Sequence, residues 1–195
     1  MPRPKVHDDA LRARLLDRAG EILSTTGPDG LSLRALAADV RTSTTAVYSL
    51  FGGKPGLLRA VYDEAFRRFG ERLSTAGTSD DPAEDLVRLG LRYRDSALAD
   101  PQFYRVMFSG ASGVEPGEES RRASARTFSP ALDIARRGVE TGVFGNDSPE
   151  QIALASWGIA HGLVALELRG DLPVDVPVAQ VYERSLRALV DGWRR

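Results

Sequence analysis

The stretch that decides the fold runs from Leu31 to Leu58 and reads LSLRALAADVRTSTTAVYSLFGGKPGLL. It holds two short segments with helical patterning, Leu33–Asp39 and Ser43–Leu50. Only Val40-Arg41-Thr42 separates them, which leaves room for nothing but a sharp turn. A short helix that follows another across such a turn is the helix-turn-helix geometry, in which the second helix enters the major groove of DNA. The stretch therefore predicts a helix-turn-helix head.

The two faces of this head carry different chemistry. Ser32 is placed to cap the first short helix. The apolar residues expected on the inner face are Leu33, Leu36, Ala37 and Val40 in or next to the first short helix and Ala46, Val47 and Phe51 in or next to the second. The outer face keeps hydroxyl groups, which can contact base edges and phosphates. Lys54 begins the following helix and offers a cation to a phosphate. The residues expected to contact duplex DNA are Ser32, Arg34, Arg41, Thr42, Ser43, Thr44, Thr45, Tyr48, Ser49 and Lys54.

Composition excludes several classes of function. The 195 residues include 26 Lys or Arg and 27 Asp or Glu, so the chain is not a uniformly basic nucleic-acid binder. The net charge is nevertheless +2 over residues 1–54 and −3 over the remainder, which favours an anionic partner for the head. With no cysteine and two histidines, thiolate chemistry and a multi-histidine metal site are excluded, and no cofactor or metal is expected.

No secretory signal begins the chain, and the longest apolar run, Ile152 to Leu168, is short of the ~20 residues that cross a bilayer. We expect a cytoplasmic protein without a membrane partner.

The rest of the chain predicts helices and no sheet. Asp81-Pro82, Asp100-Pro101 and Ser148-Pro149 each combine a capping side chain with proline at a first helical position. Apolar residues recur at helical spacing between such signals, and no segment alternates as a half-buried strand would. Residues 74–81 and 109–117 have the composition of linkers. The fold class predicted is all-α, with about nine helices.

The segment from Ile152 to Leu168 is apolar nearly all round, so it must be covered on two sides. One cover is the core of its own domain, and we expect the other to be a second copy of the chain, packed through this helix and the last one. The residues predicted at this homodimer interface are Ala153, Ala160, Val164, Tyr182, Leu186 and Leu189.

The head resembles the TetR/AcrR family of one-component transcriptional regulators over residues 8 to about 60. The resemblance rests on LSLRALA from Leu31, on the S-x-x-x-V-Y-x-x-F-x-x-K pattern from Ser43 to Lys54, and on Leu57-Leu58. It implies that residues 1–53 form the operator-binding domain, that residues 54–195 form a regulatory domain, and that Tyr48 and Lys54 contact the DNA backbone. At the turn the chain departs from the family pattern, because Arg41 stands where glycine is usual and Thr42 where an apolar residue is usual.

The W-x-x-x-H-G sequence from Trp157 to Gly162 is similar to that of the WHG subgroup of TetR-type C-terminal domains. This resemblance implies a ligand cavity among the central helices. The hypothesis is an amphiphilic cavity, although each residue alone fits a core role as well. The candidate lining residues are Tyr62, Phe66, Tyr93, Phe103, Met107, Trp157 and His161.

The sequence thus predicts a homodimeric transcriptional repressor that binds a palindromic DNA operator and is released by an unidentified hydrophobic or amphiphilic small molecule. It predicts no catalytic residues. A helical carrier or enzyme with an incidental helix-turn-helix stays open as an alternative, because folding can bring carboxylates together. So does a protein–protein adaptor.

Overall fold

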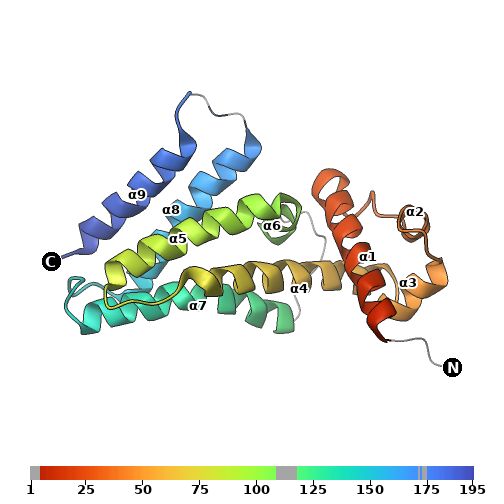
Figure 1. Cartoon of the computed structure of the whole chain (residues 1–195), viewed down its shortest axis with the longest axis horizontal. Coiled ribbons are helices and arrows are strands. Elements are labelled where there is room, and N and C mark those ends of the chain that lie inside the picture. Colours follow the sequence, from red (N-terminus) through yellow and green to blue (C-terminus); the bar gives the residue numbers. More distant parts are fainter. Residues whose placement is uncertain (1–4, 109–117, 171, 173–174) are drawn as a thin grey trace. The chain divides into compact units, whose positions relative to one another are not determined.

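A computed structural model describes residues 5–108, 118–170, 172 and 175–195 of the chain (Figure 1). Within these residues the fold is all-α, as predicted, with no strand beyond an isolated bridge between Phe144 and Arg194. Nine α-helices and one 3-10 turn (η1) are formed there. Their bounds are α1 Lys5–Thr26, α2 Leu33–Asp39, α3 Thr44–Phe51, α4 Lys54–Leu73, η1 Ser74–Ala76, α5 Pro82–Ala99, α6 Pro101–Phe108, α7 Glu118–Glu140, α8 Pro149–Arg169 and α9 Val178–Trp193.

The predicted helix starts are confirmed where proline follows a capping side chain. α5, α6 and α8 begin at the three prolines. The Asp81 carboxylate accepts from the backbone N–H of Ala83 at 2.9 Å, and Ser148 forms a capping box with Gln151. η1 occupies part of the linker expected at 74–81, whereas the linker expected at 109–117 lies outside the described residues.

The chain divides into two compact units. The N-terminal unit comprises Met1–Arg67 and Asp100–Ala123, and the C-terminal unit comprises Arg68–Ala99 and Ser124–Arg195. This division differs from the predicted functional boundary after residue 53, because α6 packs on α1 and so joins the head. The Phe103 ring of α6 lies against Gly20, where an added Cβ would be 3.1 Å from the ring. Side chains of α1 and α6 thus share one core.

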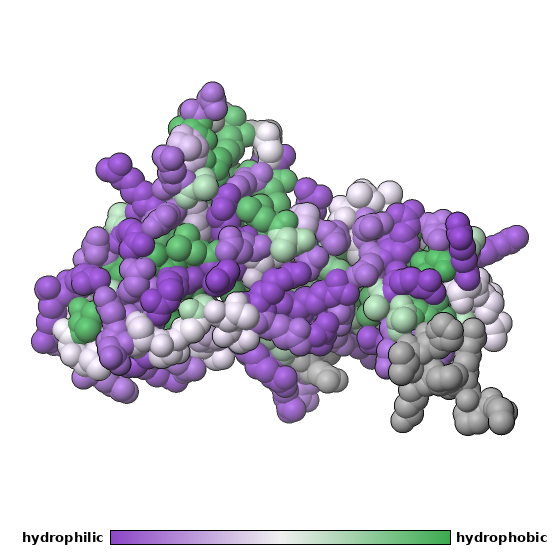
Figure 2. Space-filling view, in the orientation of Figure 1, coloured by the Kyte–Doolittle hydropathy of each residue, from purple (hydrophilic) through white to green (hydrophobic). Residues whose placement is uncertain are grey.

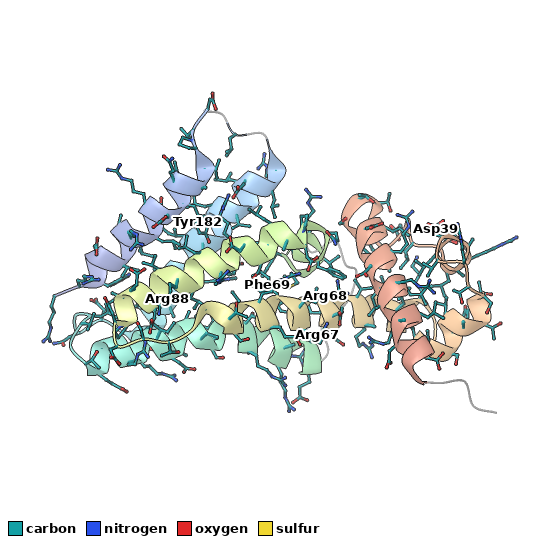
Figure 3. The ribbon with its side chains drawn as sticks, viewed as in Figure 1. Asp39, Arg67, Arg68, Phe69, Arg88 and Tyr182 are labelled. Atoms are coloured by element: carbon teal, nitrogen blue, oxygen red, sulfur yellow. The ribbon has the colours of Figure 1, made fainter. Side chains whose placement is uncertain are left out.

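The C-terminal unit is built around α5, α8 and α9, which pack against one another. Figure 3 labels Tyr182 on α9. Its side chain is fully buried and donates its hydroxyl proton to the Gly90 carbonyl of α5 at 2.8 Å. Burial raises the pKa of Tyr182, so its phenol stays protonated. Gly90 allows this approach, because a Cβ there would lie 2.6 Å from Leu186. Arg94 and Glu167 add a two-point ion pair between α5 and α8, at 2.7 and 2.5 Å.

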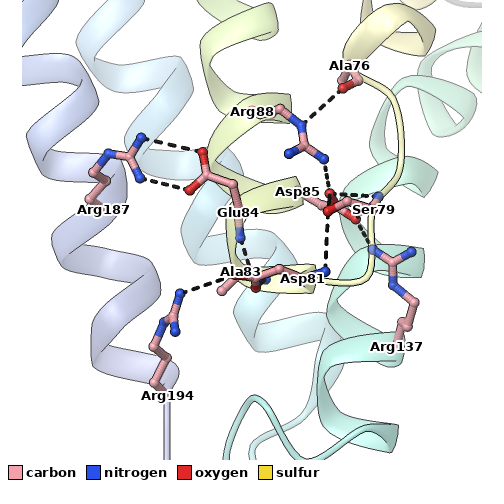
Figure 4. A network of polar contacts seen from close by, with 10 residues as sticks. All are labelled: Ala76, Ser79, Asp81, Ala83, Glu84, Asp85, Arg88, Arg137, Arg187 and Arg194. Atoms are coloured by element: carbon pink, nitrogen blue, oxygen red, sulfur yellow. Dashed lines mark hydrogen bonds and ion pairs between the residues drawn. The ribbon is translucent and has the colours of Figure 1, made fainter.

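A buried carboxylate anchors the loop before α5 (Figure 4). The Asp85 side chain is 0% exposed and accepts hydrogen bonds from the backbone and hydroxyl of Ser79 and from Arg88 and Arg137. Burial alone would raise the pKa of Asp85, but the bonds from Ser79 and Arg137 and the charge of Arg88 hold that pKa below its usual range. The loop, α5 and α7 are therefore joined at one charged group.

Candidate DNA-binding and effector sites

The two helices of the predicted helix-turn-helix, α2 and α3, are each capped by a serine. Ser32 accepts from the Ala35 N–H at 3.4 Å, and Ser43 accepts from the Ala46 N–H at 3.1 Å. α2 has the bounds that the sequence predicts, and α3 begins one residue later, at Thr44, because Ser43 is the cap rather than the first helical residue. The two serines thus fix where both helices of the motif start.

The turn between α2 and α3 is a Schellman motif with arginine in the left-handed position. The Thr42 N–H bonds to the Ala37 carbonyl at 2.8 Å, and the Arg41 N–H bonds to the Ala38 carbonyl at 3.0 Å. Arg41 has φ of +57° and is the only non-glycine with positive φ among the described residues. A Cβ in this conformation is strained, so the turn carries a cost that glycine would avoid.

The outer face of α3 is polar and exposed. Thr44, Thr45 and Ser49 are exposed, and Tyr48 is 58% exposed, whereas Val47 between them is fully buried. One edge of the Tyr48 ring lies beside Gly53, where a Cβ would be 3.3 Å from the ring. The backbone of Gly53 therefore supports a ring that leaves most of its surface to solvent.

Lys54 starts α4 directly after two glycines with positive φ, Gly52 and Gly53. Gly56 lets this helix approach α3, because a Cβ there would lie 1.8 Å from the Phe51 carbonyl oxygen. Within the described ranges no carboxylate pairs with Lys54, which is half-buried. A cation beside the first free N–H groups of a helix suits a phosphate.

Sequence reasoning missed a cation beside the turn. An open groove of about 570 Å³ is lined by Arg14, Arg18, Asp39, Val40 and Arg41. Arg18 is held by Asp39 at 2.8 Å and by Glu21 at 2.7 Å, whereas Arg14 is exposed and in no ion pair of the described chain. The N-terminal unit therefore has two exposed cations, Arg14 and Arg41, in the same open groove. No local pattern announces this, because the two residues are far apart in sequence.

A small cavity lies inside the C-terminal unit, with a volume of about 30 Å³. Several helices contribute to its wall. The lining residues are Leu73, Leu86, Leu89, Gly90, Tyr93, Thr127, Phe128, Ala131, Ser156, Trp157, Ala160 and Leu186.

Of the seven candidate lining residues, Tyr93 and Trp157 line this cavity. His161 lies next to both: its Nδ1 and the Tyr93 hydroxyl are hydrogen-bonded at 3.0 Å, and its ring is 5.4 Å from the Trp157 ring. Burial lowers the pKa of His161, which keeps the imidazole neutral at neutral pH.

The other four candidates belong to the N-terminal unit and are buried there. Their rings and thioether pack among α1, α4 and α6, as in the Tyr62–Phe66 pair at 4.9 Å and the contact of Phe103 with Gly20. The wall of the C-terminal cavity therefore does not include Tyr62, Phe66, Phe103 or Met107, and a contact of these four with an effector stays a prediction.

The residues predicted for the dimer interface need a correction. Ala153, Ala160, Val164, Tyr182 and Leu186 are buried in the C-terminal unit's own core, at 0–3% exposure, so they offer a partner no surface. Leu189 is half-buried. For Ala153, Ala160 and Val164 the prediction failed because α8 is apolar nearly all round, and the sequence does not tell which stripe turns inward. Tyr182 and Leu186 lie on the buried side of α9.

The outward stripe of α8 consists instead of Leu154, Gly158, Gly162 and Leu166, spaced four residues apart and all exposed. Leu154 is 58% and Leu166 45% exposed, and an added Cβ at either glycine would meet no atom within 4 Å. Val181 of α9 is also exposed. Figure 2 shows hydrophobic surface over the end of α8 and the start of α9, at the top of the view.

α8 is also long and apolar enough, by length and composition alone, to cross a membrane. Its inner face packs against α5 and α9 in the C-terminal unit, and the rest of its apolar surface is not buried within the chain. Among the described residues, no group of three or more His, Asp or Glu side chains could hold a metal ion.

Comparison with known proteins agrees with this architecture. The family model described as "Bacterial regulatory proteins, tetR family" matches residues 15–61, and the model described as "Tetracyclin repressor-like, C-terminal domain" matches residues 86–189, which include Trp157 to Gly162. No curated protein matches the sequence.

Solved structures extend the likeness to the whole chain. A protein with unknown function from Rhodococcus sp. RHA1 is 26% identical with a TM-score of 0.82, covering 95% of this chain and 96% of that one. The TetR family transcriptional regulator PfmR from Thermus thermophilus is 25% identical with a TM-score of 0.72, covering 93% and 100%.

AibR, solved in complex with isovaleryl coenzyme A and operator DNA, shares the fold at 17% identity and a TM-score of 0.71, covering 92% and 97%. With the helix-turn-helix head and the helical C-terminal unit both matched, the chain belongs to the TetR family of transcriptional regulators.

Proposed function

We propose that this chain is a homodimeric repressor that binds a palindromic operator and leaves it when a small molecule occupies the C-terminal unit. The observation that carries the proposal is the exposed face of α3, where Thr44, Thr45 and Ser49 surround the largely exposed Tyr48 ring. Exposed hydroxyls at the start of a recognition helix suit base edges, because they bring no charge that must be desolvated in the groove.

Flanking groups supply the contacts to the DNA backbone in this proposal. Lys54 and the N–H groups at the start of α4 bind one phosphate, and Arg34 and Arg41 are exposed on the same unit. Arg14 adds a fourth cation from α1. Ser32, Thr42 and Ser43 contribute mainly by fixing the helix ends, with Ser32 and Ser43 as caps.

The dimer forms through the outward stripe of α8 and the exposed side of α9. Gly158 and Gly162 support this surface, because a glycine inside a helix costs about 1 kcal/mol relative to alanine and nothing in the described chain needs either one. Close approach of a second α8 gives both a purpose. Two heads related by two-fold symmetry can then read half-sites about 34 Å apart.

The effector binds in the cavity lined by Tyr93 and Trp157. The protein has two states, one bound to the operator and one released, and the ligand binds the released state more tightly. The coupling free energy between ligand binding and DNA binding is typically about 1–3 kcal/mol. Location in the cytoplasm follows in this proposal from the need to reach DNA.

The experiment that tests the proposal selects bound sites from random DNA duplexes and then measures affinity against salt concentration. Lys54→Ala should weaken binding to every duplex alike and reduce the salt slope by about one unit for each protomer. Arg126→Ala removes an exposed cation of α7, in the C-terminal unit, and serves as the matched control. An unchanged slope in Lys54→Ala removes that lysine from the interface.

Substitution of Thr44 or Thr45 by valine should change which duplexes are selected, because these side chains are placed to read base edges. Equal loss on all duplexes makes them positioning residues instead. A failure of the selection to enrich any palindrome contradicts the proposed function as a whole.

A further inference from the structure

The wall of the C-terminal cavity is mainly apolar and aromatic, as is usual for a small-molecule site. None of the described residues that line it carries a charge, and three carry a hydroxyl group. Each of the three hydroxyls is already hydrogen-bonded: Thr127 donates to the Ser124 carbonyl at 2.6 Å, Ser156 donates to the Ile152 carbonyl at 2.8 Å, and Tyr93 is bonded to His161.

The aromatic rings of the wall contact other rings that hold them in place. The Tyr93 ring meets Phe69 edge to face at 4.9 Å, and the Trp157 ring meets Phe128 edge to face at 6.3 Å. His161 contacts both, through the hydrogen bond to Tyr93 and the ring contact with Trp157. Rings fixed in this way offer faces and edges of defined orientation to another ring.

The charged groups near this core are committed to one another. Arg94 and Glu167 form a two-point pair, and Arg137 is bonded to the buried Asp85 through a terminal nitrogen. The Arg137 Nε is buried without a hydrogen-bond partner, but Arg137 does not line the cavity. A neighbouring open groove of about 420 Å³ contains Arg137 beyond Leu73 and Leu89, but Asp133 lines the same groove. An anionic ligand would therefore lose its hydration in the cavity without gaining an unshared cation.

The size of the cavity bears on how a ligand enters. Its volume of about 30 Å³ holds little more than a water molecule or two, so a larger molecule requires the wall to move. α7 is suited to yield, because Pro130 lies inside it and cannot donate the usual hydrogen bond to the Arg126 carbonyl. Thr127, Phe128 and Ala131 of the wall flank that proline.

We propose that the effector of this cavity is an uncharged, mainly apolar molecule with an aromatic or similarly flat ring, and that carboxylates, acyl-coenzyme A and amines are rejected. The inference rests on the proposed function for its biological meaning, but it concerns binding alone. The ring lies against Tyr93, Phe128 and Trp157, and the partnered hydroxyls accept a hydrogen bond from a donor on the ligand.

The test measures binding to the full-length protein without DNA. The probes are toluene, phenol and indole as neutral rings, benzoate and benzylammonium as charged rings of matched size, and isovaleryl coenzyme A. In a Trp193→Phe background Trp157 is the sole tryptophan, so its fluorescence reports the cavity. We expect saturable binding of at least one neutral ring, at least 100-fold tighter than that of either charged ring.

Two variants on one helix assign the binding to the cavity. Ala131→Leu fills space at the wall and should weaken the best neutral probe at least 10-fold, whereas Ala125→Leu on the exposed side of α7 should leave its affinity unchanged. Ala160→Val is the second filling variant, used if circular dichroism shows that Ala131→Leu is not folded.

Equal or tighter binding of a charged probe or of isovaleryl coenzyme A overturns the inference, and so does the absence of saturable binding of every neutral ring up to its solubility. Neutral-ring binding that leaves operator affinity unchanged sustains the ligand class but contradicts the ligand-responsive repressor.

Discussion

At the scale of single residues, Arg41 combines a strained backbone conformation with a cation that we propose to contact DNA. Its φ of +57° is a conformation that glycine adopts without strain, and the Schellman bonds of Arg41 and Thr42 require it. In exchange the turn gains an exposed guanidinium beside Arg14. In the proposed complex, the attraction between this cation and a DNA phosphate offsets the free energy of the backbone strain.

We predict that Arg41→Gly raises the free energy of unfolding by about 0.5–1 kcal/mol, because relief of the left-handed strain exceeds the entropy that glycine adds to the unfolded chain. The same change should reduce the salt slope of DNA binding. Arg41→Ala removes the cation but keeps the strain. It should therefore reduce the salt slope of DNA binding as Arg41→Gly does, but without raising the free energy of unfolding. Urea unfolding and salt titration of both variants separate the two effects.

His161 leads to a prediction about pH. Burial lowers its pKa below 6.5, so the unfolded chain takes up the proton first as the pH falls. Stability contributed by the neutral imidazole is complete above pH 6.5 and is lost as the pH falls below that value towards the lowered pKa. His161→Asn should flatten the dependence of melting temperature on pH in this window.

At the scale of elements, Asp85 decides how the loop after η1 meets α5 and α7. The loop has no helix of its own to satisfy its backbone, and the Asp85 carboxylate accepts from Ser79 while it neutralises Arg88 and Arg137 (Figure 4). Removal of a buried charge leaves its partners uncompensated, which is the costly way to break such a network.

Asp85→Asn is accordingly expected to lower the free energy of unfolding by about 3 kcal/mol, since the amide keeps a bond to Ser79 but not the two charges. Asp133→Asn is the matched control, because Asp133 is exposed and its pairing with Arg136 spans 3.6 Å; it should cost less than about 0.5 kcal/mol. Thermal or urea denaturation measures both, and similar losses in the two variants contradict the anchoring role.

At the scale of the whole molecule, the outward stripe of α8 is the feature that the single chain leaves unexplained. Two leucines and two glycines are exposed there, on a helix whose opposite face fills the core. Helical propensity alone favours alanine over glycine at both positions by about 1 kcal/mol each. A partner helix that lies close to the glycine backbones accounts for their presence.

The double substitution Gly158→Ala and Gly162→Ala should therefore stabilise the helix in the monomer yet weaken association, because the added methyl groups stand between the two chains. Sedimentation should show a dimer of about twice 21.2 kDa for the wild type. The variant should have a higher dissociation constant, so that it is monomeric at concentrations where the wild type is still a dimer. Leu154→Glu should raise the dissociation constant at least 100-fold. Ala125→Glu, at an exposed site on α7, should leave it unchanged. A stable monomer in the wild type rules out the proposed dimer.

Local interactions explain what the sequence alone determined. The starts of α5, α6 and α8, the serine caps of α2 and α3, and the left-handed turn at Arg41 all depend on residues within a few positions of one another. The same holds for the outer face of α3. Val47 faces the core, and Tyr48, the next residue of the helix, points away from that side. Apart from the cap at Ser43, which was predicted as the first residue of its helix, these features could be predicted, and the structure has them.

Tertiary structure alone decided which side of each apolar helix meets which neighbour. α8 is apolar all round, so no periodicity separates Ala153 and Val164 in the core from Leu154 and Leu166 at the surface. Nor does sequence spacing reveal that Tyr93 and Trp157 share a wall while Phe103 packs on Gly20. Such contacts join residues far apart in the chain, and they are selected by the packing of whole helices rather than by any signal within one of them.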